Sequence, residues 1–283
     1  MEVELRQLRC LVAVIEEGTF TDAAIELRMS QAAVSRNIAA LEHSLGVRLV
    51  ERTTRSISLT SSGEGVLAKA RRILSLMADL ERDARAGTGH VRIGYAWSAL
   101  GEHTTEFQRR WAATFAATEL HLVRSNTPSA GLRDGTTDLA ILRRLPETAA
   151  VEHVLIGEEK RYCSMSSDDP LAPKRSVTLA QIAQRAVAMD LRTGSTSLEL
   201  WPEHGRPQEV IPIHDIEDWL NVIGSGRARG ITAESTAHQY RRRGLVYRPV
   251  RDAPLVPVYA AWLRKDPPRE REQIVELLMG LYR

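Results

Sequence analysis

Four polar side chains near the start of one predicted helix could make hydrogen bonds to the edges of nucleic-acid bases: Ser30, Gln31, Ser35 and Arg36. The same segment carries an apolar stripe at helical spacing, formed by Val34, Ile38, Leu41 and Leu45. Because that stripe must face a core, the polar residues face away from it, together with Ala32 and Ala39. Small side chains on this face would let the helix backbone enter a groove about 12 Å wide. The alternative is a solvated helix face that happens to be rich in alanine.

Two helices separated by a short break are needed to position these residues. Ala23, Ala24 and Leu27 have the apolar spacing of a preceding helix. The break falls at Met29 and Ser30, where the Ser30 hydroxyl can cap the second helix. A helix-turn-helix of this kind places its second helix in the major groove of DNA. The predicted base and backbone contacts on this helix are Ser30, Gln31, Ala32, Ser35 and Arg36.

A β-hairpin is predicted directly after this helix. Two short β-prone runs, residues 48–50 and 56–59, flank a turn that carries Arg52 and Arg55. Residues 28–60 contain five Arg and two acidic residues, whereas residues 1–61 contain seven Arg and eight acidic residues. The positive charge is therefore local. Since phosphate attraction depends on the charges that touch the DNA backbone, Arg52 and Arg55 complete the predicted DNA contacts.

From Leu5 to Leu67 the residue types of helix, turn, recognition helix, hairpin and following helix closely resemble those of the LysR-type transcriptional regulator family. The chain departs from the family pattern at Ala32, where Pro is usual, and at Val50, where Phe is usual. The resemblance implies an N-terminal all-α winged helix-turn-helix with a long linker helix. It also implies a C-terminal α/β, two-lobed, periplasmic-binding-protein-like effector domain, and hence a sequence-specific transcriptional regulator switched by a small molecule.

A long helix is expected after the hairpin, opened by a capping box of Ser61 and Glu64. Its apolar residues recur at alternating intervals of four and three, the seam of a coiled coil: Val66, Ala70, Ile73, Met77 and Leu80. We expect this seam to join two chains into a homodimer that presents two recognition helices to inverted half-sites in double-stranded DNA. The alternative is an amphipathic core helix. The family resemblance further implies that dimers associate into tetramers.

The expected organisation is a winged helix-turn-helix at 1–61, a linker and dimerisation helix at 62–86, and an effector-binding domain at 87–283. Alternating strand and helix patterns after residue 90 predict two parallel-sheet lobes, lobe I from 90–157 and 234–283 and lobe II from 161–232. The chain would cross between them near 157–160 and 233–235, and a short helix is expected at 129–134. A formal net charge of only +2 excludes a polybasic protein.

Effectors of open α/β sheets bind beyond the carboxyl ends of the strands. The residues predicted there are Ser98, Ala99, Thr127, Ser129, Arg143, Arg192, Thr193 and Ser195. The hydroxyl groups suit a small anion, and Arg143 and Arg192 could bind an effector carboxylate. For each Ser and Thr, helix capping is an equally good explanation.

No catalytic or metal site is predicted, and no cofactor. Ser225 lacks the strand–turn–helix context of a hydrolase nucleophile, and the eight histidines are scattered. Cys10 and Cys163 are expected to be buried, unpaired thiols of a protein in the reducing cytoplasm, with no signal peptide or membrane span. RNA polymerase is a further partner to consider. Two rival classes are a solute-binding receptor, which would lack the first ninety residues, and an enzyme fused to a DNA-binding head.

Overall fold

The computed structural model describes residues 3–52, 57–86 and 89–283. The chain divides into two compact units. The first consists of 1–87 with 133–136, and the second of 88–132 with 137–283. Each unit is considered by itself below. Among the helices of the described ranges, none combines the length and the apolar character that a membrane crossing requires.

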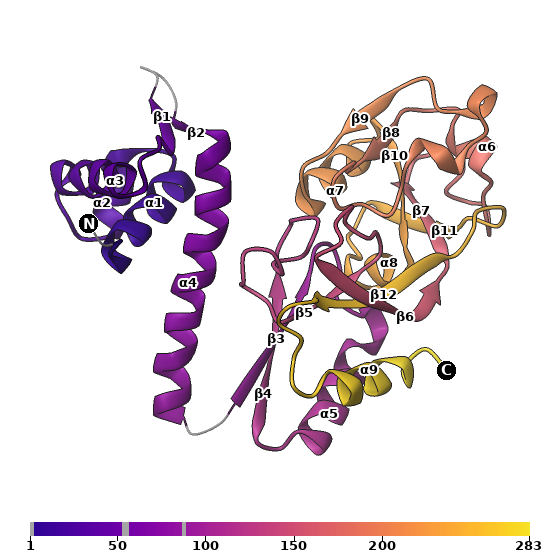
Figure 1. Ribbon diagram of the computed structural model, residues 1–283. Helices are drawn as coiled ribbons and strands as arrows, with labels where there is room; N and C mark the ends of the chain where they lie inside the picture. Colours follow the sequence, from indigo (N-terminus) through magenta and orange to yellow (C-terminus); the bar gives the residue numbers. More distant parts are fainter. Residues whose placement is uncertain (1–2, 53–56, 87–88) are drawn as a thin grey trace. The chain divides into compact units, whose positions relative to one another are not determined.

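The first unit is a helical domain with a small hairpin (Figure 1). Its elements are α1 (Leu5–Glu17), α2 (Phe20–Glu26), α3 (Gln31–Leu45), β1 (Val50–Arg52), β2 (Ile57–Leu59) and α4 (Ser61–Ala86). Gly18 ends α1 in the left-handed conformation, with φ of 74°. The Thr19 hydroxyl then accepts a hydrogen bond from the Asp22 backbone N–H and starts α2. The core of the unit contains Leu11, Val14, Val34, Ile38, Leu41, Leu67 and Ala70.

The hairpin differs slightly from the one predicted. Its antiparallel strands pair Val50 with Leu59 and Arg52 with Ile57, so that β1 begins two residues later than the expected run at 48–50. The predicted capping of the next helix by Ser61 is wrong. The Thr60 hydroxyl accepts from the Gly63 N–H at 2.9 Å and donates to the Arg48 carbonyl at 2.7 Å, so that one side chain both starts α4 and holds it to the hairpin.

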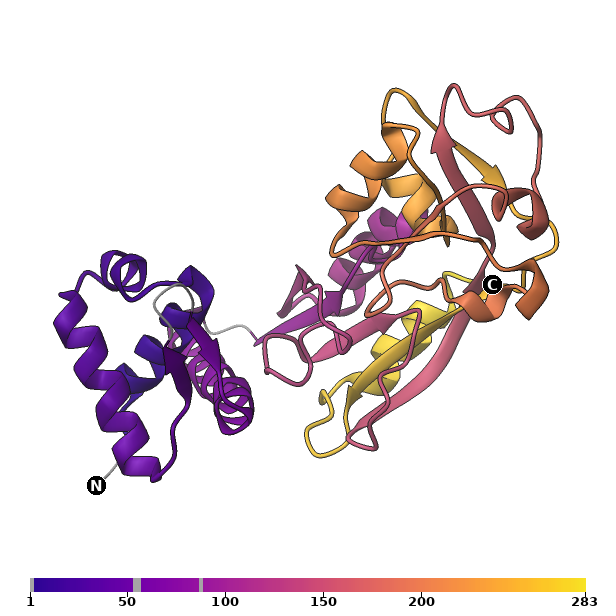
Figure 2. The same cartoon turned by 90° about the horizontal axis from the view of Figure 1, so that it is seen from above.

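The second unit contains two five-stranded sheets, each in its own lobe (Figure 1 and Figure 2). The first sheet has the order β4 (Thr118–Arg124), β3 (Gly89–Tyr95), β5 (Leu139–Leu142), β12 (Val256–Leu263) and β6 (Val151–Glu159). Strands β3, β4 and β5 are parallel, and β12 runs antiparallel between β5 and β6. Helices α5 (Thr104–Thr114) and α9 (Arg271–Met279) cover one face through an apolar cluster that includes Phe107, Trp111, Ile274 and Leu278.

The second sheet has the order β11 (Leu245–Pro249), β7 (Arg161–Ser166), β10 (Arg229–Ala233), β8 (Val187–Met189) and β9 (Val210–Pro212). Helix α6 (Leu179–Ile182) shares one apolar cluster with this sheet, and α7 (Ile216–Gly224) shares another. The second lobe also carries the short 3-10 turns η2 (Leu198–Leu200) and η3 (Glu203–Gly205).

Three expectations about the second unit are wrong. Both sheets are mixed rather than parallel, since β12 in the first and β7 in the second run antiparallel to their neighbours. Strand β11 pairs with β7, so it belongs to the second sheet, and the chain returns to the first sheet between β11 and β12 rather than near 233–235. Residues 234–239 instead form a helix, α8 (Glu234–Gln239), which packs against η1 (Gly101–His103). The expected helix at 129–134 is a series of turns, in which Ala130 has φ of 46°.

Candidate functional site

Helix α3 is held by a buried apolar stripe on one side. The Ser30 hydroxyl accepts from the Ala33 N–H at 3.2 Å, which confirms the predicted cap. Val34, Ile38 and Leu41 are fully buried, as predicted, but Leu45 is 39% exposed because the helix ends there at the left-handed Gly46. The stripe that anchors the helix is therefore one turn shorter than the sequence indicated.

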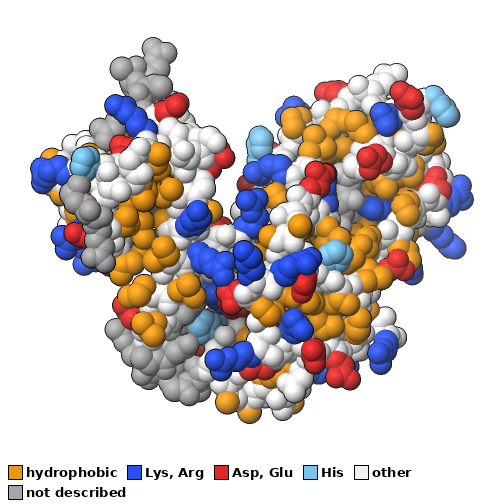
Figure 3. Space-filling view, viewed as in Figure 1, with side chains coloured by type: hydrophobic (Ala, Val, Ile, Leu, Met, Phe, Trp, Pro, Cys, Tyr) orange, Lys and Arg blue, Asp and Glu red, His pale blue; other side chains and the backbone are white. Residues whose placement is uncertain are grey.

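The opposite side of α3 is open to solvent. Of the predicted contact residues, Ser30, Gln31, Ala32 and Arg36 are exposed, and Ser35 is half-buried. Basic side chains also reach the surface of this unit in Figure 3. Two further predicted contacts are not tested, since Arg55 lies outside the described residues and only the backbone of Arg52 is described.

Glu42 was missed by the sequence reasoning. Its carboxylate oxygen Oε1 accepts hydrogen bonds from the Leu49 and Val50 N–H groups at 2.8 and 3.1 Å. These contacts join the recognition helix to the first strand of the hairpin. A charge-assisted bond of this kind positions the hairpin relative to the helix end. Acidic residues are common on helices, and nothing in the spacing of Glu42 distinguishes it.

Helix α4 presents two different faces. Ala70 is 1% exposed and Leu67 6%, and both pack in the core of the first unit, with Val66 partly buried beside them. Ile73 and Leu80, by contrast, are 43% and 63% exposed. Leu76 is also exposed, at 54%, and Met77 is half-buried. The predicted seam is thus divided: its first part already has a partner within the chain, and its second part is solvent-facing.

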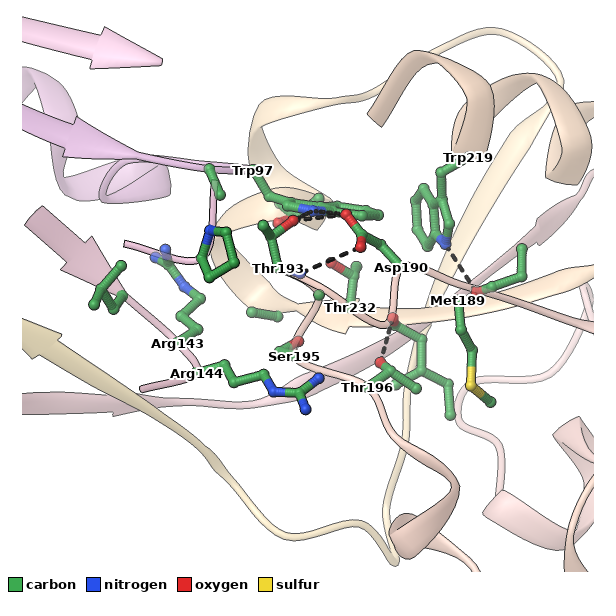
Figure 4. A pocket seen from close by; sticks show the side chains of 18 of the residues that line it. Trp97, Arg143, Arg144, Met189, Asp190, Thr193, Ser195, Thr196, Trp219 and Thr232 are labelled. Atoms are coloured by element: carbon green, nitrogen blue, oxygen red, sulfur yellow. Dashed lines mark hydrogen bonds between the residues drawn. The ribbon is translucent and has the colours of Figure 1, made fainter. Parts of the chain in front are cut away.

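A cleft lies at the carboxyl ends of strands from both sheets of the second unit, where α/β folds bind ligands (Figure 4). The first sheet contributes residues that follow β3, β4 and β5, and the second sheet contributes residues that follow β8 and β10. The cavity within it measures about 30 Å³. Four predicted effector residues line the cleft, namely Thr127, Arg143, Thr193 and Ser195.

The other four predicted effector residues lie elsewhere. Ser98 is fully buried, and its hydroxyl lies 2.8 Å from the Ser235 hydroxyl. Ala99 and Ser129 are also buried outside the cleft lining. Arg192 is exposed and donates to the His214 carbonyl at 3.0 Å. Ser98 thus bonds to side chains of the fold rather than lining the cleft, and it does not cap a helix, which was the alternative in the sequence analysis.

Arg143 lines the cleft, but its guanidinium is already hydrogen-bonded to other groups of the protein. Its guanidinium donates to the Glu159 carboxylate at 2.6 and 3.2 Å, and to the carbonyls of Ser98 and Ala99 at 2.8 and 2.9 Å. Both side chains of the ion pair are less than 10% exposed, at 7% and 6%. The prediction that Arg143 is available for an effector carboxylate is therefore not supported by this geometry. The same Glu159 carboxylate accepts from the Ser235 hydroxyl at 2.7 Å.

The charges of this pair determine its protonation. Burial alone would raise the pKa of Glu159, but the Arg143 charge and the hydrogen bonds from Arg143 and Ser235 outweigh burial and lower the pKa. Burial would likewise lower the pKa of Arg143, and the Glu159 charge reverses the shift. Both groups are therefore ionised at neutral pH, and the pair is electrically balanced within the second unit.

Asp190 and Trp97 were not predicted as site residues. Asp190 follows β8 and is 2% exposed. One of its carboxylate oxygens, Oδ1, accepts from the Arg192 and Thr193 N–H groups, and the other, Oδ2, lies 2.6 Å from the Thr193 hydroxyl. Trp97 follows β3, and its indole Nε1 donates to Thr193 Oγ1 at 3.0 Å. Figure 4 shows these three side chains pointing towards one another. A lone acidic residue after a strand and a lone Trp carry no motif by which sequence reasoning could have found them.

Three more hydrogen bonds cross the cleft. Asn126, which follows β4, donates to the His214 carbonyl of the second lobe at 2.5 Å, and its side-chain oxygen lies 2.9 Å from the Thr193 hydroxyl. Arg144 donates to the Leu191 carbonyl at 2.7 Å. Together with Trp97, these contacts join the two lobes across the cleft.

Both cysteines are buried in the described part of the chain. Cys10 and Cys163 are buried and unpaired, as expected, and burial raises the pKa of both thiols. Thiols in such surroundings remain protonated and unreactive. Within residues 3–52, 57–86 and 89–283, no group of three or more His, Cys, Asp or Glu side chains is placed to hold a metal ion.

Comparison with known proteins agrees with both halves of the chain. Residues 5–64 match the bacterial regulatory helix-turn-helix protein model of the lysR family, and residues 84–279 match the LysR substrate binding domain. The chain belongs to the LysR family of transcriptional regulators. It is therefore a DNA-binding transcriptional regulator with an effector-binding domain.

Curated LysR-type relatives support the same assignment. The uncharacterized HTH-type transcriptional regulator YnfL of Escherichia coli is 37% identical over 193 residues, which are 65% of this chain and 64% of that protein. The HTH-type transcriptional regulator TfdS of Cupriavidus pinatubonensis is 34% identical over 220 residues, 75% of this chain and 71% of that protein. These relatives are transcriptional regulators rather than enzymes.

The fold matches solved structures of LysR regulators over almost the whole chain. The crystal structure of CbnR, a LysR family transcriptional regulator, has a TM-score of 0.71 at 24% sequence identity and covers 99% of both chains. The full-length structure of BenM has a TM-score of 0.56 at 23% identity. At this level of identity the likeness concerns the fold, which is the predicted winged helix-turn-helix followed by a two-lobed α/β domain.

Proposed function

We propose that this LysR-type regulator binds double-stranded DNA with α3 in the major groove and with Arg36 at base edges. The observation that carries the proposal is the two-sided character of α3: Val34, Ile38 and Leu41 are fully buried, while Gln31, Ala32 and Arg36 on the other side are exposed. A helix anchored by one face and small on the other can enter the groove without unfolding its core. A solved structure of CbnR, which shares this fold, is a complex with its target DNA, and this supports DNA binding by the present chain.

The wing completes the proposed DNA interface. Glu42 and Thr60 hold the hairpin to the recognition helix and to α4. We assign the arginines of the hairpin turn, Arg52 and Arg55, to contacts with phosphates or the minor groove, where guanidinium groups are favoured. Arg36 would then account for sequence discrimination, and the hairpin arginines for salt-dependent affinity.

The functional DNA-binding form is proposed to be a homodimer joined through the exposed part of α4. Ile73, Leu76 and Leu80 are exposed large apolar side chains on one helix, and a second copy of the helix would remove them from water. A two-fold axis through such a contact presents two α3 helices to inverted half-sites. Association of dimers into tetramers and contact with RNA polymerase belong to the same proposal.

The cleft of the second unit is proposed to hold a small-molecule effector that regulates DNA binding. It lies between two sheets that are joined by two crossings, so that a bound molecule can favour one arrangement of the lobes over another. The regulator is proposed to act in the cytoplasm, without a cofactor and without catalysing a reaction.

Selection of DNA from a random duplex library tests the proposal. We expect the purified chain to enrich sequences with two inverted half-sites whose centres are separated by about one turn of DNA, or a multiple of it. Binding of a selected duplex should weaken steeply as salt concentration rises. Enrichment of single, unpaired half-sites would contradict the dimer proposal, and no enrichment over the starting library would contradict sequence-specific binding.

A further inference from the structure

Trp97 extends from the first lobe into the second. Its indole N–H donates to Thr193 Oγ1 at 3.0 Å and lies 3.4 Å from Asp190 Oδ2. Its ring packs edge-on against Trp219 of α7, with ring centroids 5.5 Å apart and planes at 79°. Trp97 therefore contributes to an apolar cluster whose other members, such as Ile216 and Trp219, come from the second lobe. An aromatic side chain from one lobe thus has the contacts of a molecule bound by the other.

The space that remains in the cleft is too small for a metabolite. The cavity of about 30 Å³ has room for roughly two water molecules. Pockets that enclose drug-sized molecules measure about 300 Å³ or more. With Trp97 in place, an aromatic effector therefore cannot reach Asp190 and Trp219. The indole must leave before a ligand of that size can occupy the cleft.

The polar groups that Trp97 meets are acceptors rather than cations. Arg143 and Arg144 are the two cationic side chains among the described residues that line the cleft. Arg143 is neutralised by Glu159, and Arg144 is exposed at the Leu191 carbonyl. The buried ionisable group on the far side of the cleft is the Asp190 carboxylate. Asp190 Oδ1 lies 4.0 Å from Nε of the exposed Arg192, whereas Oδ2 faces the indole of Trp97. The position of the indole N–H is therefore surrounded by acceptors, which favours a hydrogen-bond donor over an anionic carboxylate, contrary to the sequence-based expectation.

We propose that Trp97 is an intramolecular occupant of the effector cleft, and that the effector is a neutral or cationic planar aromatic compound with an N–H donor. The inference rests on the proposed effector role of the cleft. Such a compound displaces the indole, donates to Thr193 and Asp190, and packs its edge or face against Trp219. Trp97 then no longer joins the lobes. The ligand changes the lobe arrangement because it binds the form without the Trp97 contact more tightly than the form in which Trp97 joins the lobes.

Removal of the side chain gives a direct test with a probe of the same shape. In the full-length Trp97→Ala variant, free indole should bind in the vacated space, as measured by isothermal titration calorimetry. Benzofuran, in which an oxygen replaces the N–H, is the matched probe. We expect it to bind about tenfold or more weakly, because its ring oxygen cannot make the hydrogen bond that an N–H donates to Thr193 Oγ1 and Asp190 Oδ2. Wild-type protein should bind indole more weakly than the variant, since the attached indole competes.

A second set of variants tests whether Thr193 and Trp97 determine the affinity for indole. Thr193→Val in the Trp97→Ala background should reduce the preference for indole over benzofuran. Trp97→Phe, which retains a ring without the N–H, should bind indole with an affinity between those of wild type and Trp97→Ala. Circular dichroism establishes that each variant is folded. Should Trp97→Ala fail to fold, the comparison of Trp97→Phe with wild type decides the question.

Several results would overturn the proposal. Equal binding of indole and benzofuran by a folded variant would remove the donor requirement. Indole binding that is no tighter in Trp97→Ala and Trp97→Phe than in wild type would show that Trp97 does not occupy the ligand position. Tighter binding of benzoate than of indole by wild type would reject the ligand class. The DNA selection tests the proposed function separately: enrichment of specific DNA combined with any of these results would overturn this inference alone.

Discussion

The recognition helix and the effector cleft differ in how their residues are assembled. The proposed contacts of α3 lie within one segment, Ser30 to Arg36, whereas the cleft is lined by residues that range from Ala96 to Thr236. In the helix, spacing alone determines which side chains share a face. In the cleft, a side chain can pair with a residue that is far away in the sequence, as Arg143 pairs with Glu159. Local patterns are therefore a better guide to the first site than to the second.

The largest expected effect concerns this long-range pairing. Glu159→Ala leaves the buried Arg143 guanidinium without its counter-ion, so we expect the free energy of unfolding of the second unit to fall by about 3–5 kcal/mol. Glu106→Ala is the matched control, because its ion pair with Arg110 is exposed and is worth less than about 1 kcal/mol. Urea denaturation followed by tryptophan fluorescence measures both. A similar loss for the two variants would contradict a dominant role for the buried pair.

The same pair predicts a pH dependence. Because the folded-state pKa of Glu159 is lowered, its contribution to stability is fully present above the unfolded value of about 4.3 and is lost as the pH falls through the folded value. Lowering the pH from 7 to 3 should therefore reduce the stability of wild type more than that of Glu159→Gln. Thermal unfolding at each pH measures the difference. Parallel curves for the two proteins would show that other carboxylates cause the acid sensitivity.

Arg36→Ala tests the proposed DNA contact of the recognition helix α3. Loss of one arginine contact to base edges should weaken specific DNA binding by about 1–3 kcal/mol, or roughly fivefold to 150-fold, in fluorescence anisotropy with a selected duplex. Arg9→Ala removes the same charge from an exposed position on α1 and should have a much smaller effect. If the two variants lose affinity equally, general charge rather than α3 placement explains binding.

The apolar seam of helix α4 could be predicted only in part from local spacing. One part of the seam is covered within the chain, and the other part is exposed. Leu80→Lys would place an ammonium in the proposed dimer contact, and we expect the dimer dissociation constant to rise about tenfold or more in analytical ultracentrifugation. Ala78→Lys adds the same charge to an exposed position on the other side of the helix. Unchanged assembly of Leu80→Lys would place the dimer contact elsewhere.

The smallest effect is expected at the start of the recognition helix. Ser30→Ala removes the hydroxyl that accepts from the Ala33 N–H, which should cost about 1 kcal/mol of stability in the first unit. Ser30→Asp is the matched variant, since it retains a capping oxygen. Its stability in urea should remain close to that of wild type, and a loss as large as that of Ser30→Ala would show that the cap is not the cause.

Much of the fold could be predicted from the sequence, and two of the errors have a common origin. The helix-turn-helix, the hairpin, the long helix and most strands of the second unit were found from spacing and turn residues. These two errors concern partner choice. Thr60 rather than Ser61 caps α4 because it also bonds to the hairpin, and β11 joins the second sheet because its neighbour is β7. Neither partner is a sequence neighbour that a local pattern can indicate.

Local chemistry was sufficient for the DNA-binding half: a period of 3.6 residues, a capping hydroxyl and a run of arginines are properties of adjacent residues, and they specified α3 and its exposed face. The character of the cleft came from packing between distant segments. Arg143 acquired a buried counter-ion, Trp97 contacted the second lobe, and the Asp190 side chain became buried beside it. A buried charge or donor must find a partner wherever the fold brings one, and that choice depends on contacts between residues that are remote in the chain.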